Sequence, residues 1–118
     1  MSQTKTKKDS RTIRECTAKW EYNGESGTVE SAEVRVQYYS PTIAQLKADR
    51  LAEERRIEED PTTVIWLSEL LSKSIYALHD IPNEASVKQP SVEWLDEQDL
   101  KNLTAVRSAI DEDLKAGK

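Results

Sequence analysis

The side chains best suited to chemistry in this chain are one cysteine and one histidine. Cys16 and His79 are the residue types of a nucleophile and its general base. Strand-like alternation, however, places Cys16 on an apolar face, where a buried thiol is unreactive. His79 precedes Asp80 near the expected end of a helix, a position more typical of a hydrogen-bonded or exposed side chain. We therefore expect no catalytic residues.

Other kinds of site are equally poorly supported. The acidic pairs Glu53–Glu54 and Glu58–Glu59 lie in a densely charged segment, without the buried surroundings that separate two carboxylate pKa values for acid–base catalysis. One histidine, one cysteine and no Asp-rich loop containing glycine argue against a metal centre. The glycines of the segment NGESG belong to a turn rather than to a phosphate-binding loop. The sequence thus predicts a protein that is not an enzyme and uses no metal or cofactor.

Composition restricts the class of partner. The chain has 118 residues, a net charge of −5, 36% hydrophobic residues and 33% charged residues, which fits one small domain with a lean core. The negative charge gives no basic surface for a nucleic-acid backbone. No apolar run reaches the length of a membrane span, and the N-terminus has no apolar core of a secretory signal. With a single cysteine and no intramolecular disulfide, a cytoplasmic location is expected.

The first third of the chain predicts a disordered tail and a hairpin. Residues 1–11 are polar and aperiodic, which is typical of disorder, so one domain is expected from 12 to 118. From about 12 to 39, apolar and polar residues alternate on both sides of Asn23-Gly24. Asn-Gly favours a tight turn, so this segment predicts an antiparallel hairpin with one buried face. A lone hairpin is marginal and needs support from other elements.

Three main helices are expected after the hairpin, at about 41–59, 61–79 and 97–116. Ser40-Pro41 and Asp60-Pro61 are start signals for the first two. Helical spacing is shared by the apolar residues of the second and third, which are Val64, Leu67, Leu71, Ile75 and Leu78, then Leu100, Leu103, Val106, Ile110 and Leu114. The predicted fold class is therefore α+β and mainly helical, with the second helix at the centre of the core.

Two surfaces are candidates for contact with a partner. The helix at 41–59 is charged in its second half, and this predicts either a solvated face or a polar contact face. The central helix carries more apolar residues than the rest of the chain is expected to cover. These remaining residues, Ile65, Trp66, Leu70, Tyr76 and Ala77, are the candidate partner-binding residues.

The order of elements and several short motifs resemble the tail assembly chaperones of long-tailed bacteriophages and prophages. The resemblance covers about residues 34–113. It rests on a Ser-Pro-Thr helix start, an apolar helix that ends at a Leu-x-Asp corner, a turn of the form Ser-x-Glu-Trp-Leu-Asp, and a final amphipathic helix. These motifs are Ser40-Pro41-Thr42, Leu78-His79-Asp80, Ser91 to Asp96, and Asn102-Leu103 through Asp113. The C-terminal Pro-Lys tail common in that family is replaced by Lys115-Ala116-Gly117-Lys118.

The resemblance implies a non-enzymatic role. Members of that family bind the tape-measure protein of the tail, keep it soluble and help to recruit tail-tube subunits, and they are absent from the mature virion. Many are also made in a longer form by ribosomal frameshifting. The partners implied are therefore other phage proteins in the bacterial cytoplasm, with no nucleic acid and no membrane. An oligomer remains possible.

Two alternatives stay open from the residues themselves. One is a small structural subunit of a phage particle, whose N-terminal hairpin adds to the sheet edge of a neighbour. The other is an acidic inhibitor of a host nucleic-acid-binding system, suggested by the net charge of −5. Interleaved basic residues such as Arg50, Arg55 and Lys73 argue against the second.

Overall fold

The structure is a computed structural model, and it describes residues 11–59 and 66–116. Three segments lie outside the described residues. They are residues 1–10 of the predicted tail, residues 60–65 at the predicted start of the second helix, which include Val64 and Ile65, and residues 117–118.

Four antiparallel strands form the sheet, in the order β1-β2-β3-β4. β1 (Ile13–Asn23) and β2 (Val29–Tyr39) are joined by a tight loop, in which the Gly24 N–H donates to the Thr28 carbonyl at 2.8 Å and Gly27 has a φ of +83°. A positive φ is easily adopted by glycine, which lacks a Cβ. β3 (Ile75–His79) and the short β4 (Ser86–Lys88) complete the sheet. The sheet is therefore an up-and-down meander, in which β1 and β4 are the edges.

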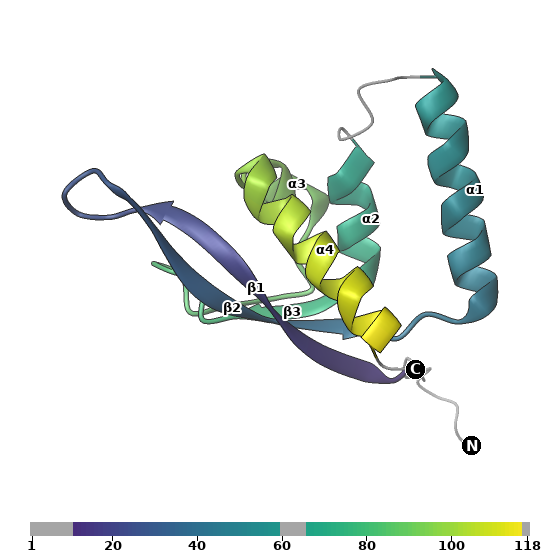
Figure 1. Cartoon of the computed structure of the whole chain (residues 1–118), viewed down its shortest axis with the longest axis horizontal. Helices are drawn as coiled ribbons and strands as arrows, with labels where there is room; N and C mark the ends of the chain where they lie inside the picture. The colour runs from purple at the N-terminus through teal and green to yellow at the C-terminus, as the bar shows by residue number, and fades with distance from the viewer. Residues whose placement is uncertain (1–10, 60–65, 117–118) are drawn as a thin grey trace, which may run out of the picture.

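The predicted fold class, a hairpin followed by three main helices, is wrong. The segment expected to be one helix from 61 to 79 is a short helix, α2 (Leu67–Ser74), that runs directly into strand β3. The sheet has four strands rather than the two of a hairpin, and strand β4 lies between the segments predicted as the second and third helices. The chain therefore has a four-stranded sheet, and its helices lie on one side of it (Figure 1).

A β-bulge explains why β3 resembles a helix in the sequence. Ala77 pairs with Gln37, but the next residue of β2, Tyr38, pairs with Ile75, so Tyr76 is an extra residue in β3. The extra residue puts Ile75 and Leu78 on the same face of the sheet, and both are buried in the core. Without the bulge, residues three apart in a strand would lie on opposite faces. The spacing of three is therefore compatible with a helix and with this bulged strand.

Three helices cover one face of the sheet (Figure 1). They are α2, the short α3 (Val92–Asp96) and α4 (Leu100–Ala116). The Ser91 hydroxyl caps α3 by accepting from the Trp94 N–H at 3.1 Å, and Asp99 accepts from the Lys101 N–H at the start of α4. The shared core contains residues of both layers: Ala18, Trp20, Val34, Val36, Tyr38, Leu67, Leu71, Ile75, Leu78, Ile81, Leu95, Leu103, Val106 and Ile110.

The remaining helix, α1 (Ile43–Glu59), stands apart from these layers (Figure 1). It begins two residues later than the sequence predicted. Its start is a capping box, in which Thr42 Oγ1 accepts from the Gln45 N–H at 3.1 Å and Gln45 Oε1 accepts from the Thr42 N–H at 2.9 Å. None of its residues is buried.

Candidate partner-binding surface

The predicted partner-binding residues do not form one surface. Ile65 lies outside the described residues. Ala77 is buried in β3, between Gln37 and Lys88 of the neighbouring strands. Tyr76 lies in the β-bulge, where its ring makes an edge contact with that of Tyr39 at 5.8 Å. The grouping assumed one continuous helix, and it fails for Tyr76 and Ala77 because the chain changes to a strand at Ile75.

Trp66 and Leu70 remain close together at the start of α2. Leu70 is half-buried and packs against the core. The half-buried Trp66 ring lies 5.2 Å from the guanidinium of Arg107 on α4. Among the described residues, the indole Nε1 is buried and has no hydrogen-bond partner. Arg107 also donates to Glu53 of α1 at 3.0 Å, so its guanidinium contacts both Trp66 and α1.

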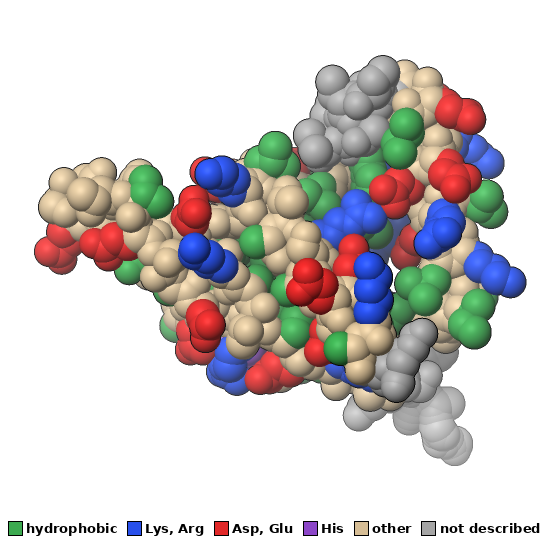
Figure 2. Space-filling model, viewed as in Figure 1, with side chains coloured by type: hydrophobic (Ala, Val, Ile, Leu, Met, Phe, Trp, Pro, Cys, Tyr) green, Lys and Arg blue, Asp and Glu red, His purple; other side chains and the backbone are tan. Residues whose placement is uncertain are grey.

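α1 exposes the largest set of apolar side chains on the described molecule. The exposed fractions are 72% for Ile43, 46% for Leu46, 62% for Leu51 and 46% for Ile57. Figure 2 shows apolar side chains interleaved with charged ones along this helix. An apolar residue that is exposed singly is ordinary, but a helix with no buried residue leaves its whole apolar surface free to contact a partner.

Within the described part of the chain, two ion pairs connect α1 to the rest of the domain. Arg56 Nη2 lies 2.8 Å from Glu69 Oε1 of α2, and Glu53 Oε1 lies 3.0 Å from Arg107 Nη2 of α4. Half-exposed pairs of this kind contribute up to about 1 kcal/mol each. Both are in the second half of α1. The charged half of the helix therefore contacts α2 and α4 through Arg56 and Glu53, although none of its residues is buried.

An open groove of about 440 Å³ separates the first half of α1 from the α2–β3 junction. The α1 side of the groove is polar and includes Gln45 and Asp49. The opposite side includes Lys73 and Ile75. Leu46 lies one residue along from Gln45, and a step of one residue is 100° around a helix. Leu46 therefore lies beside the groove, whereas Ile43, about 160° around the helix from Gln45, points away from it.

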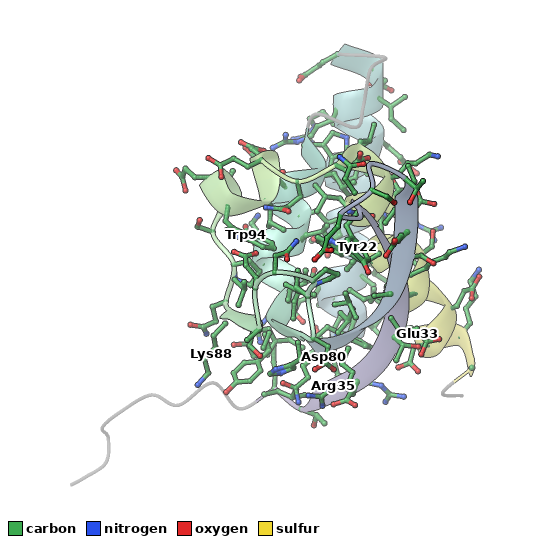
Figure 3. All side chains as sticks on the ribbon, turned by 90° about the vertical axis from the view of Figure 1, so that its left-hand side faces the viewer. Tyr22, Glu33, Arg35, Asp80, Lys88 and Trp94 are labelled. Atoms are coloured by element: carbon green, nitrogen blue, oxygen red, sulfur yellow. The ribbon has the colours of Figure 1, made fainter. Side chains whose placement is uncertain are left out.

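The open face of the sheet carries a chain of polar side chains that the sequence did not predict. His79 Nε2 lies 2.7 Å from Gln37 Oε1, and His79 Nδ1 lies 2.9 Å from Ser86 Oγ. Arg35 Nε donates to Asp80 Oδ2 at 2.9 Å, and both side chains point away from the helices (Figure 3). These bonds connect β2, β3 and β4. Cross-strand pairing would have revealed them, but it needs the register, which the sequence does not give.

Cys16 and His79 are not brought together. Cys16 pairs with Val36, whose side chain is in the core, whereas His79 pairs with Arg35 on the open face. The two side chains therefore lie on opposite faces of the sheet, and they cannot form the nucleophile and base pair that the sequence analysis considered. Burial, followed by the negative charges of Asp113 and Glu15, raises the pKa of the Cys16 thiol to about 11.

The raised pKa predicts that stability falls with alkaline pH. The unfolded thiol titrates near its ordinary pKa of 9.0 and the folded one near 11. The thiol of the unfolded state therefore loses its proton at a lower pH than that of the folded state. The contribution of Cys16 to the free energy of unfolding is fully present below pH 9 and is lost as pH rises to 11. We expect Cys16→Ala to reduce the loss of unfolding free energy between about pH 8 and pH 10.5, measured by urea denaturation. An equal loss in both proteins would contradict this expectation.

Within residues 11–59 and 66–116, no group of three or more His, Cys, Asp or Glu side chains is placed to hold a metal ion. In the same residues, no helix is both long and apolar enough to cross a membrane.

Comparison with protein-family models, with curated proteins and with solved structures finds no match to this chain.

Proposed function

We propose that this chain is a non-enzymatic tail assembly chaperone of a long-tailed bacteriophage, and that it binds an apolar helical segment of the tape-measure protein along α1. The observation that carries the proposal is that α1 has 17 residues, none of them buried. Such a chaperone would also help to recruit tail-tube subunits, would act in the cytoplasm of the bacterial host, and would be absent from the mature virion.

The geometry of α1 supports a helical client. Ile43, Leu46 and Ile57 lie on one side of the helix, and Leu51 lies about 80° away from Ile43. From Ile43 to Ile57 this side is about 21 Å long, at 1.5 Å per residue. A client helix can place residues at i, i+3, i+4 and i+7 against such a stripe. The ion pairs of Glu53 and Arg56 lie within the length of this stripe and connect α1 to α4 and α2.

Co-purification with the tape-measure protein of the same phage tests the proposal. We expect the wild-type chain to form a soluble complex with it when the two are expressed together. Changing Ile43 and Leu46 to aspartate should weaken the complex at least about tenfold, because charges replace apolar contacts within the proposed interface. The folding of the variant should be unchanged, since both side chains are exposed. Binding is measured by pull-down and by titration of the purified proteins.

The matched control is Val29→Asp. Val29 is 68% exposed, as Ile43 is at 72%, but it lies at the far end of the β1–β2 hairpin. We expect this variant to bind the client as the wild-type chain does. If the wild-type chain neither co-purifies with the tape-measure protein nor keeps it soluble, the proposed function is wrong. If the wild-type chain binds and the Ile43 and Leu46 variant binds equally well, the surface is elsewhere.

A further inference from the structure

The outer edge of β1 is open for pairing over part of its length. The Ser40 N–H donates to the Thr12 carbonyl at 2.7 Å, and the Gly24 N–H donates to the Thr28 carbonyl at 2.8 Å. Given the β1–β2 register, these bonds show that the even-numbered residues of β1 form their backbone hydrogen bonds with β2. The odd-numbered residues direct their backbone N–H and C=O groups outward, away from β2. The outward groups therefore belong to alternate residues along β1, including Glu15, Thr17 and Lys19.

Asn102 of α4 marks where the open edge ends. The Glu21 N–H donates to Asn102 Oδ1 at 2.8 Å, and Asn102 Nδ2 donates to the Glu21 carbonyl at 3.0 Å. The buried amide therefore occupies both outward groups of Glu21, as a neighbouring strand would. No described residue bonds the outward backbone groups of Glu15, Thr17 or Lys19. An edge left open in this way is a template for another strand.

A groove of about 680 Å³ runs beside this part of β1. One side is formed by residues 15–19 of β1, and the other by α4, which contributes the small residues Ala105, Ser108 and Ala109 and the acidic residues Glu112 and Asp113. The Asn102–Glu21 bonds at one end, and the ion pair of Arg14 with Asp113 at the other, show that α4 runs alongside β1. The small side chains of α4 therefore lie level with Thr17, where they leave space for another element.

We propose that two copies of this chain pair through this edge, antiparallel about a twofold axis at Thr17. In that register Glu15 of each copy lies opposite Lys19 of the other, and Thr17 lies opposite its own counterpart. Opposite charges and threonine pairs both stabilise directly opposed positions in antiparallel sheets. The three residue pairs from 15 to 19 exchange about six backbone hydrogen bonds. The two four-stranded sheets become one continuous sheet.

The charges of β1 favour this register over the registers with a twofold axis at a nearby residue. A twofold axis at Glu15 would oppose two glutamates, and an axis at Lys19 would oppose two lysines; like charges placed directly opposite are destabilising. An axis at Ala18 would oppose Glu15 to Glu21. Only the axis at Thr17 places both charged residues of the open segment opposite unlike charges. At this axis the two α4 helices meet through Ala105, Ser108 and Ala109, whose small side chains permit a close approach.

This inference does not rest on the proposed function. The β1 edge and α1 are separate surfaces, and the proposed dimer leaves the apolar residues of α1 uncovered. Loss of client binding by the Ile43 and Leu46 variant and loss of pairing by a β1 variant are therefore separate results.

A charge exchange tests the pairing. We expect the wild-type chain to be a dimer by sedimentation equilibrium, and Glu15→Lys and Lys19→Glu each to raise the dissociation constant at least about tenfold, since two unlike pairs become two like pairs. Mixing the two variants should restore a dimer, because lysines at 15 and 19 of one chain then face glutamates at 19 and 15 of the other. Glu93→Lys on α3 makes the same change of charge away from β1, and should leave the dimer intact.

Thr17→Pro tests the backbone hydrogen bonds independently of charge. The Thr17 N–H points outward, so proline removes a donor of the intermolecular ladder and leaves the β1–β2 ladder complete. We expect a monomer with unchanged circular dichroism. A wild-type chain that stays monomeric up to about 1 mM would overturn the proposal. So would a dimer that persists in Glu15→Lys, Lys19→Glu and Thr17→Pro, since its interface would then lie elsewhere.

Discussion

Replacing Leu71 by aspartate is expected to abolish the folded state. Leu71 is 1% exposed, at the centre of the layer that α2 forms over the sheet. The change removes a buried apolar side chain, which costs about 2–5 kcal/mol, and adds a carboxylate that has no buried partner. The sum approaches the whole stability of a small domain, about 5–15 kcal/mol. Circular dichroism and thermal melting measure the result.

Leu51→Asp is the matched control. It makes the same substitution on α1, where Leu51 is 62% exposed. We expect a loss of less than about 1 kcal/mol and an unchanged far-UV spectrum. A Leu71→Asp variant that melts with the wild-type chain would mean that α2 is not part of the core. A Leu51→Asp variant that unfolds would mean that α1 packs against the domain more closely than its exposure indicates.

The predictable part of the fold is the part with an unambiguous period. Alternation over 12–39 and the Asn23-Gly24 turn predict a hairpin, and β1 and β2 lie within those bounds. The last helix also has an unambiguous period, since Leu103, Val106 and Ile110 recur at helical spacing and are all buried. In both elements local pattern and tertiary burial agree.

The α2–β3 segment was mispredicted because two structures share its pattern. Leu67, Leu71, Ile75 and Leu78 are all buried, as the helical interpretation required, but the last two reach the core from a bulged strand. No glycine or proline marks the change from helix to strand. The hydroxyl of Ser74 donates to the Leu70 carbonyl at 3.0 Å near the helix end, a weak local signal beside the β-prone Ile-Tyr that follows.

The candidate surface was harder to predict than the fold. The stripe of α1 is interrupted by Arg50 and Glu53, so its sequence resembles an ordinary solvated helix. Whether Ile43 and Leu46 are covered depends on the position of α1 relative to the rest of the domain. This position is set by the link from β2 to α1 and by two long-range ion pairs. The pairing of charges on β1 likewise becomes visible only once the sheet order makes β1 an edge.

Trp20→Ala should cause the second-largest loss of stability. Trp20 is 4% exposed and is the largest side chain that β1 gives to the core, in a chain without phenylalanine. Its ring stacks on that of Trp94 with centroids 6.5 Å apart and an interplanar angle of 27°. Truncation of a buried tryptophan costs about 3–5 kcal/mol, which includes the cavity that it leaves. Urea denaturation followed by circular dichroism measures the change in unfolding free energy.

Trp66→Phe tests whether a tryptophan outside the core contributes as much to the free energy of unfolding as the buried Trp20 does. Trp66 is half-buried at the start of α2, and phenylalanine keeps a ring beneath the Arg107 guanidinium while removing the buried Nε1 that has no partner among the described residues. An unpaired buried donor costs about 1–3 kcal/mol, so its removal offsets the loss of ring area. We expect stability within about 1 kcal/mol of the wild-type chain. If Trp66→Phe destabilises as much as Trp20→Ala, Trp66 contributes to the core as Trp20 does.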